Sequence, residues 1–199
     1  DVVLFAARRD EDIVWGLVDA AVSPTLTITP LQLSAVNSSV TVEIEMSSHA
    51  VPAERVVLIE PMDDWRRRDV RFLARNGHLS VGLAERCARL LESASLTAQV
   101  DAARAALLGA TPETVVAART EASLLSQRAA AAFMAASGGR GVSQGHQAQR
   151  LMREAAFLLV FGQTRAIKEA QLTVLSGSVV GPLGAPLGPP AGAPTPRAV

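Results

Sequence analysis

SGGRGVSQGHQAQRLMREAAFLLVFGQTR, residues 137–165, is the stretch that decides the fold of this chain. Its start, Gly138-Gly139-Arg140-Gly141, interrupts an alanine-rich helical pattern, because glycine favours chain reversal over helix. From about His146 to Val160 the apolar residues again recur at helical spacing. Phe161-Gly162-Gln163-Thr164 then makes a tight connection. The stretch therefore predicts helices that pack together through short reversals of the chain.

Helical spacing also covers the segments on either side of this stretch. It predicts four more helices: Trp65 to about Glu92 after an N-cap at Asp63 or Asp64, Leu96 to Leu108, Thr111 as N-cap to about Ser137, and Arg165 to about Leu175 after the N-cap Thr164. The first of these helices carries small residues at every third or fourth position, namely Gly77, Ser80, Ala84 and Ala88. Such a ridge lets another helix approach closely, so we predict an up-down helical bundle.

The first third of the chain has the two-residue period of β-strands instead. Two apolar runs, Val2–Ala7 and Ile13–Val18, flank a charged turn and predict a hairpin. Thr25–Thr29 and Val40–Met46 alternate between apolar and polar residues, and prolines keep these strands short. We therefore predict an α+β fold, in which a short antiparallel β segment, part of a barrel or sandwich, precedes the bundle.

These patterns divide the chain into three parts. We expect a partial β domain over residues 1–60, the helical bundle over 61–175, and a flexible tail over 176–199, because the Gly- and Pro-rich tail cannot bury enough surface to order itself. Asp1 stands directly before an apolar run, which we interpret as the start of a piece cut from a longer chain.

Composition excludes several classes of partner. The 19 basic and 19 acidic side chains cancel, so there is no net field to attract nucleic acid or an anionic membrane. No stretch approaches the roughly 20 apolar residues that cross a bilayer, and we expect no secretory signal. The single cysteine, Cys87, rules out an internal disulfide and is predicted to be a buried thiol. We therefore expect a cytoplasmic protein.

The residues alone do not assemble a self-sufficient active site. The three histidines His49, His78 and His146 are isolated, with no second ligand at metal-binding spacing. The sequence contains no phosphate-binding Walker loop and no Gly-x-Ser-x-Gly nucleophile elbow. We predict no metal site.

Four segments in order nevertheless resemble one family. They are the strands of Asp1–Val18, the segment His49–Val56, the turn Gly138–Val142 followed by Arg150, Arg153, Glu154 and Ala155, and the loop Phe161–Ile167. The chain from Asp1 to about Leu175 is similar to the C-terminal part of an acyl-CoA dehydrogenase, namely the end of the middle β domain and the C-terminal helical domain. In that family the second segment reads Val-Pro-Ala-Asp-x-Val. The third contains Gly-Gly-x-Gly followed by Arg-x-x-Arg-Asp-Ala, and the fourth contains Glu-Gly-Thr.

The resemblance implies FAD-dependent desaturation of an acyl-CoA between Cα and Cβ, with a carboxylate as the base. The usual base is the Glu of the Glu-Gly-Thr loop, and alignment through Arg150 and Arg153 places Gly162 there. Other members carry the base on the first helix of the bundle, where Val70 fills the slot and Asp69 stands one residue away, about 100° around the helix. If only the base is missing, Gly162→Glu should raise the activity.

For the cofactor, the resemblance implies contacts from the glycine turn and the loop. The implied contacts are Gly138, Gly139, Gly141, Gln163 and Thr164. Glycines allow close approach of backbone to a phosphate or adenine, but the turn also fits a plain helix cap and reversal.

Three functions remain open at this point. The first is a flavoenzyme in the intact chain or complex, with the fragment alone inactive, bound to acyl-CoA and dimeric or tetrameric through the bundle. The second is a non-catalytic family member that serves as the structural subunit of a hetero-oligomer. The third is a helical interaction module unrelated to flavins.

Overall fold

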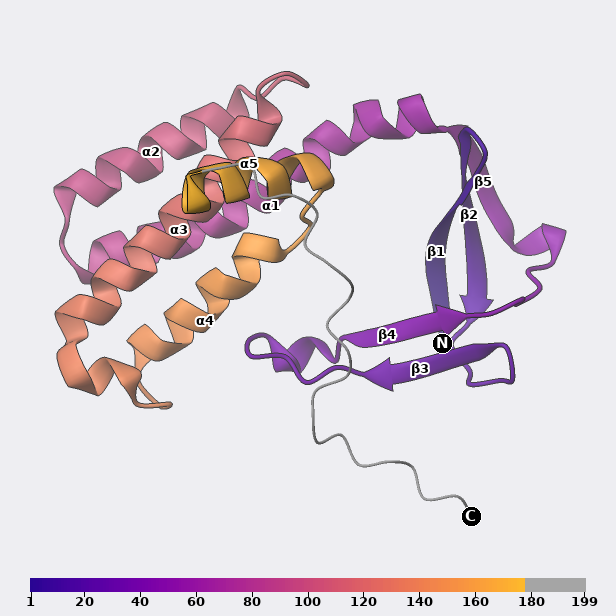
Figure 1. The fold of residues 1–199 in the computed structure, drawn as a ribbon, viewed down its shortest axis with the longest axis horizontal. Coiled ribbons are helices and arrows are strands. Elements are labelled where there is room, and N and C mark those ends of the chain that lie inside the picture. Colours follow the sequence, from indigo (N-terminus) through magenta and orange to yellow (C-terminus); the bar gives the residue numbers. More distant parts are fainter. Residues whose placement is uncertain (178–199) are drawn as a thin grey trace, which may run out of the picture.

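The computed structural model describes residues 1–177 and places the strands at one end and the helices at the other (Figure 1). The flexible tail predicted over 176–199 lies outside the described residues from 178 onward. The predicted order is confirmed, with antiparallel strands first and five α-helices after them.

The first sheet is antiparallel and has the strand order β1-β2-β5. Its strands are β1 (Val2–Arg9), β2 (Asp12–Asp19) and β5 (Val56–Pro61). The predicted hairpin is formed by β1 and β2, which pair from Val2↔Asp19 to Arg9↔Asp12 around Asp10 and Glu11. Asp10 has φ 51° there, a left-handed conformation that aspartate tolerates in turns.

The second sheet is the hairpin of β3 (Leu26–Pro30) and β4 (Val42–Met46), which lies crosswise below the first sheet in Figure 1. The 3₁₀ turn η1 (Asn37–Ser39) lies in their connection, and η2 (Ala53–Arg55) precedes β5. At the open end of this hairpin Thr25 Oγ1 and His49 Nδ1 lie 2.8 Å apart in a hydrogen bond. His49 is therefore a structural partner of Thr25.

The helices follow the predicted order closely. They are α1 (Met62–Leu90), α2 (Ala94–Leu108), α3 (Val115–Ser137), α4 (Gln147–Val160) and α5 (Arg165–Ser176). The glycine break predicted after α3 is the 3₁₀ turn η3 (Gly138–Val142), with Gly138 at φ 59°. None of the helices within residues 1–177 has the length and apolar content that a membrane span requires.

Helix starts show where local signals succeed and fail. The Thr164 hydroxyl accepts from the Ile167 amide at 3.4 Å and caps α5 as predicted. Helix α1 instead begins at Met62, with Pro61 as N-cap and no side-chain cap. The reason is tertiary, because the Met62 amide donates to the Glu11 carbonyl of the β1–β2 turn at 2.9 Å. The start of α1 is thus set by its junction with the sheet.

The start of α3 also differs from the prediction by a few residues. Thr111 does not cap the helix directly but opens a turn over 111–114, and α3 begins at Val115. The Thr111 carbonyl accepts from the Val115 amide at 2.9 Å, so this turn leads directly into the helix.

The core is built from small residues, as the composition requires. Helix α3 contacts all four other helices and runs between α2 and α4 in Figure 1. The whole predicted ridge on α1 is buried, with Ala84 at 0% and Ala88 at 1% exposed. Cys87 lies beside it with no exposed surface, and burial raises the pKa of its thiol to about 11.

A substitution at Gly77 tests whether α1 and α2 pack closely along the ridge. A Cβ at this position would lie 2.5 Å from Leu107 Cδ2 of α2, whose side chain is itself buried. Gly77→Ala should therefore lower the free energy of unfolding by about 1–3 kcal/mol, the usual cost of overpacking. Gly82→Ala on the same helix is the control, because a Cβ there meets nothing within 4 Å. The control should gain up to about 1 kcal/mol from helix propensity. Urea unfolding measures both, and equal effects would contradict the close approach.

Candidate functional site

A cavity of about 600 Å³ lies where the first half of α1 faces the three-stranded sheet. It is lined by Trp15 of β2, Leu58 of β5, and Trp65, Arg68, Asp69 and Phe72 of α1. Trp15 and Leu58 are paired across the sheet and so point to the same face. The cavity is thus largely aromatic and apolar, with one carboxyl group and one guanidinium group.

Asp69 is the carboxyl group of this cavity. Desolvation raises the pKa of Asp69 above its ordinary value, because the charged form loses contact with water. On α1 the residues Trp65, Asp69, Phe72 and Asn76 follow one another at spacings of three and four, which places them on one face of the helix. The half-buried Val70, which fills the slot that the resemblance gives to a base, lies one residue around the helix.

The walls of the cavity are held by Glu60, which is only 6% exposed. Its Oε1 accepts from Trp15 Nε1 at 2.7 Å and from Arg68 Nη2 at 2.6 Å. The bond from Arg68 lowers the pKa of Glu60, so the carboxylate stays charged beside its partners. One carboxylate therefore ties β2, β5 and α1 together around the aromatic residues.

The α4–α5 loop, Phe161–Thr164, lies against the same helix further along. Gly162 has φ +60°, and a Cβ added to it would lie 2.4 Å from Asn76 Nδ2 of α1. Asn76 is two helical turns from Asp69, about 10.5 Å along the axis. The loop therefore packs against the same face of α1 that carries Asp69.

The side chains of Gln163 and Thr164 are already engaged within the fold. Gln163 Nε2 donates to Gln171 Oε1 at 2.6 Å, and the Thr164 hydroxyl caps α5. Two of the polar groups in this loop, Gln163 Nε2 and the Thr164 hydroxyl oxygen, therefore have partners within the bundle.

The predicted contacts in the glycine turn lie at the other end of α4 from this loop. Helix α4 has 14 residues, which makes it about 21 Å long. A Cβ on Gly138 or Gly139 would meet nothing within 4 Å, whereas one on Gly141 would lie 2.7 Å from Met134 Sδ. Gly141 is thus needed for the packing of the turn, and the structure does not bring the two groups of predicted contacts together.

Two of the four motif residues of α4 border a second cavity, of about 480 Å³, between α1 and α4. Arg150 and Glu154 lie at its edge and form an ion pair at 3.4 Å, with Phe157 further along the wall. Ala155 is fully buried in the bundle core. This cavity is mainly apolar on the α1 side, where Leu79 and Leu83 line it.

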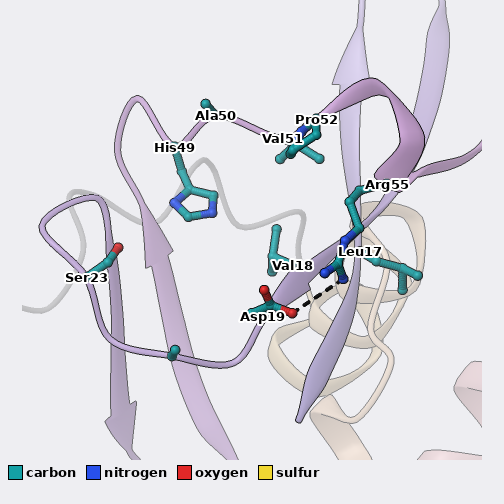
Figure 2. A pocket seen from close by; sticks show the side chains of 10 residues that line it. Leu17, Val18, Asp19, Ser23, His49, Ala50, Val51, Pro52 and Arg55 are labelled. Atoms are coloured by element: carbon teal, nitrogen blue, oxygen red, sulfur yellow. Dashed lines mark ion pairs between the residues drawn. The ribbon is translucent and has the colours of Figure 1, made fainter.

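A third cavity, of about 350 Å³, lies between the end of β2 and the open end of the β3–β4 hairpin. Figure 2 shows His49 and Ser23 on one side of it and Arg55 on the other. Arg55 Nη1 and Asp19 Oδ1 form an ion pair at 3.4 Å, shown by the dashed line. This cavity lies between the two sheets, and Thr25 occupies the Nδ1 of His49. Within residues 1–177 no three His, Cys, Asp or Glu side chains gather as a metal site.

Sequence reasoning proposed Asp69 and Gly162 but did not single out four residues around them. Trp65, Phe72 and Asn76 share the face of Asp69, and their spacing along the predicted helix was an available signal. Trp15 had no such signal, because its place in the cavity depends on the pairing of β2 with β5.

The comparisons with known proteins rest on three-dimensional structure. No family model and no curated protein matches the sequence. Butyryl-CoA dehydrogenase from Megasphaera elsdenii matches with a TM-score of 0.69 and 18% identity, over 89% of this chain and 55% of that chain.

Two further solved structures agree with this match. A glutaryl-coenzyme A dehydrogenase in complex with glutaryl-CoA matches with a TM-score of 0.70 and 17% identity, over 88% of this chain and 55% of that chain. A glutaryl-CoA dehydrogenase from Mycobacterium smegmatis in complex with FADH2 matches with a TM-score of 0.53 and 15% identity, over 90% and 55%. This chain thus spans about 55% of the length of these structures. The predicted resemblance is confirmed at the level of the fold: strands and bundle together have the architecture of the C-terminal region of acyl-CoA dehydrogenases.

Proposed function

We propose that this chain forms one wall of a flavin-dependent site that desaturates an acyl-CoA thioester between Cα and Cβ. The observation that carries the proposal is Asp69, a carboxyl group with a raised pKa in an aromatic cavity between α1 and the sheet. A base with a pKa moved toward neutrality is suited to take a proton from carbon, and perturbed carboxyl groups in cavities are enriched at functional sites.

In this proposal Asp69 takes the α proton of the thioester and becomes protonated, while the β carbon loses its hydrogen as hydride. Bound FAD supplies the acceptor of that hydride. The carbon–hydrogen bonds at Cα and Cβ break, and a double bond forms between the two carbons. The apolar residues Trp65, Phe72 and Leu58 would contact the acyl chain and keep water from the carboxyl group.

The residues present fit the flavin only in part. The backbone at Gly138 and Gly139 is open to close approach, since a Cβ there would meet no atom within 4 Å. In the loop, Gln163 Nε2 and the Thr164 hydroxyl oxygen already have partners, namely Gln171 and the first turn of α5. We therefore assign flavin contacts in the glycine turn to the backbone.

One observation favours a second function, a structural subunit without a base. Alignment through Arg150 and Arg153 places Gly162 at the usual Glu. The left-handed φ of +60° suits Gly162 to the glycine of Glu-Gly-Thr instead, which would move the usual Glu to Phe161. In both alignments the position lacks a carboxylate. A partner subunit would then supply the Glu, and the bundle would form the dimer or tetramer.

Tryptophan fluorescence tests whether the cavity binds acyl-CoA. The two tryptophans of the chain, Trp15 and Trp65, both line it. Titration of FAD-loaded protein with butyryl-CoA should quench their emission at concentrations of about 1 μM to 1 mM. Phe72→Asp should abolish the quenching, because it adds a charge to the cavity. Leu108→Asp, at a 74% exposed position of α2, should have no effect.

Flavin uptake is the second half of this test. Protein incubated with FAD and freed of excess should retain the yellow flavin absorbance near one equivalent. Colourless protein, or emission unchanged by butyryl-CoA, would contradict a flavin-dependent acyl-CoA site and leave the helical interaction module.

A further inference from the structure

Arg119 is the one charged side chain in the interior of the bundle among the described residues. It lies in α3 and is 1% exposed, and among residues 1–177 no carboxylate forms an ion pair with it. Burial lowers the pKa of Arg119, as expected for a cation removed from water. A buried charge without a counter-charge is costly unless polar groups surround it, so its surroundings require an explanation.

The guanidinium group is held between three helices. On one side Nη1 donates to the hydroxyls of Ser80 on α1 and Ser123 on α3. On the other side Nη2 donates to the Leu158 carbonyl at 3.3 Å and to the Phe161 carbonyl at 2.9 Å. These two carbonyls belong to the C-terminal end of α4 and to the first residue of the loop.

The C-terminal end of α4 supplies partial negative charge beside the guanidinium group. The last carbonyls of a helix have no partner within the helix and carry the negative end of its dipole, which favours a cation there. Arg119 therefore stabilises the exit of α4 into the Phe161–Thr164 loop, at the point where the chain turns back toward α5.

A second buried side chain holds the other half of the loop. Gln171 of α5 is 2% exposed, donates to the Leu159 carbonyl at 2.9 Å, and accepts from Gln163 Nε2 at 2.6 Å. Between these two anchors Gly162 lies against Asn76 of α1. Buried side chains of the bundle therefore hold the loop in its conformation.

We propose that Arg119 is a positioning residue that holds the Phe161–Thr164 loop against α1. The role of Arg119 in holding the loop does not depend on the proposed function, whereas its effect on ligand binding does. Only arginine suits this place, because its planar fork reaches two carbonyls and two hydroxyls at once. Lysine would carry the same charge as a single point and could not span both sides.

Amide hydrogen exchange tests the proposal without any ligand. The Phe161 amide donates to Phe157 O at 2.9 Å and the Gln163 amide to Val160 O at 3.1 Å, so both report on the loop. In Arg119→Met and Arg119→Lys these two amides should exchange at least tenfold faster. Amides of α2 should keep their wild-type rates. The matched control is Arg128→Met, an exposed arginine of the same helix paired with Glu121.

Each outcome of this experiment decides the proposal. Faster exchange confined to the loop, with Arg128→Met unchanged, supports it. A uniform rise over all helices, or a loop with wild-type rates in Arg119→Lys, would overturn it, because Arg119 would then be a core residue only. If the Met variant does not fold, the Lys variant decides, since it keeps the charge and most of the stem.

Butyryl-CoA binding distinguishes this proposal from the proposed function. In FAD-loaded Arg119→Lys the affinity for butyryl-CoA, read by tryptophan fluorescence, should fall at least tenfold. A wild-type protein that binds no butyryl-CoA contradicts the proposed function, while the exchange rates still decide the role of Arg119. A wild-type affinity in a variant with a loosened loop would overturn the link between loop and ligand.

Discussion

In the intact chain or complex, replacing Asp69 with Asn should slow the reduction of bound flavin by butyryl-CoA about 10²–10⁴-fold, the usual contribution of a positioned general base. Asn keeps the shape of the side chain and cannot accept the proton. Anaerobic stopped-flow measurement of the loss of flavin absorbance isolates this step from later electron transfer. Asp69→Glu should retain part of the rate, because a carboxylate remains within the cavity. Asp64→Asn, at an exposed position five residues earlier on α1, is the matched control.

The pH dependence gives the same test a second readout. Because burial raises the pKa of Asp69 above the ordinary 3.8, the rate should rise with pH through a pKa higher than that value. Asp69→Asn should lack this limb of the profile. A raised pKa also means that the carboxyl group contributes stability below pH 3.8 that is lost as pH rises through the folded-state pKa. The Asn variant should therefore be no less stable than wild type at neutral pH.

A wild-type rate in Asp69→Asn would show that Asp69 is not the base. If instead neither the wild-type chain nor Asp69→Asn reduces the flavin, the base lies outside this chain. The second function would then hold, with the carboxylate on a partner subunit. Mixing such a partner with the wild-type chain should restore reduction of the flavin, and the Asp69 substitution should not change that restored rate.

Most of the fold followed from local signals in the sequence. The β1–β2 hairpin, the glycine break and the start of α5 are each encoded within a few residues, through a charged turn, glycines and the Thr164 cap. The start of α1 was misplaced because a tertiary hydrogen bond from Met62 to Glu11 sets it. No pattern along the chain contains that contact.

The candidate site was less predictable for a related physical reason. The family resemblance marked the positions of Gly162 and Val70, and Asp69 was proposed only as the carboxyl group next to Val70. Arg119 sits in an alanine-rich helix where an arginine is expected to face solvent, and its burial depends on carbonyls about 40 residues away in the chain. Likewise, no pattern in the sequence around Asn76 indicates that it lies against Gly162 of the α4–α5 loop.

Gly162→Glu should not restore a base by itself, contrary to the expectation from sequence alone. At φ +60° a residue with a Cβ is strained by about 1–2 kcal/mol. The Cβ would also lie 2.4 Å from Asn76 Nδ2, the far end of a half-buried side chain that must turn away, at a cost of about 0.5–1.5 kcal/mol. The variant should thus lose about 1.5–3.5 kcal/mol of unfolding free energy in urea and show no gain in flavin reduction. Unchanged stability would mean that the loop adapts and that Asn76 does not limit position 162.

The double variant Asn76→Gly/Gly162→Glu separates the contact from the backbone strain. Asn76→Gly alone should cost about 1 kcal/mol, the penalty for glycine inside a helix. Because it also removes the amide that meets position 162, the double variant should be more stable than the sum of the two single changes, by about 1 kcal/mol or more. In an Asp69→Asn background with FAD bound, the double change should place a carboxylate beside α1. This protein should then reduce the flavin with butyryl-CoA faster than Asp69→Asn alone does. Strictly additive stabilities would show that Asn76 and Gly162 do not interact, and the space for a base in the loop would then be limited by the left-handed backbone of Gly162 alone.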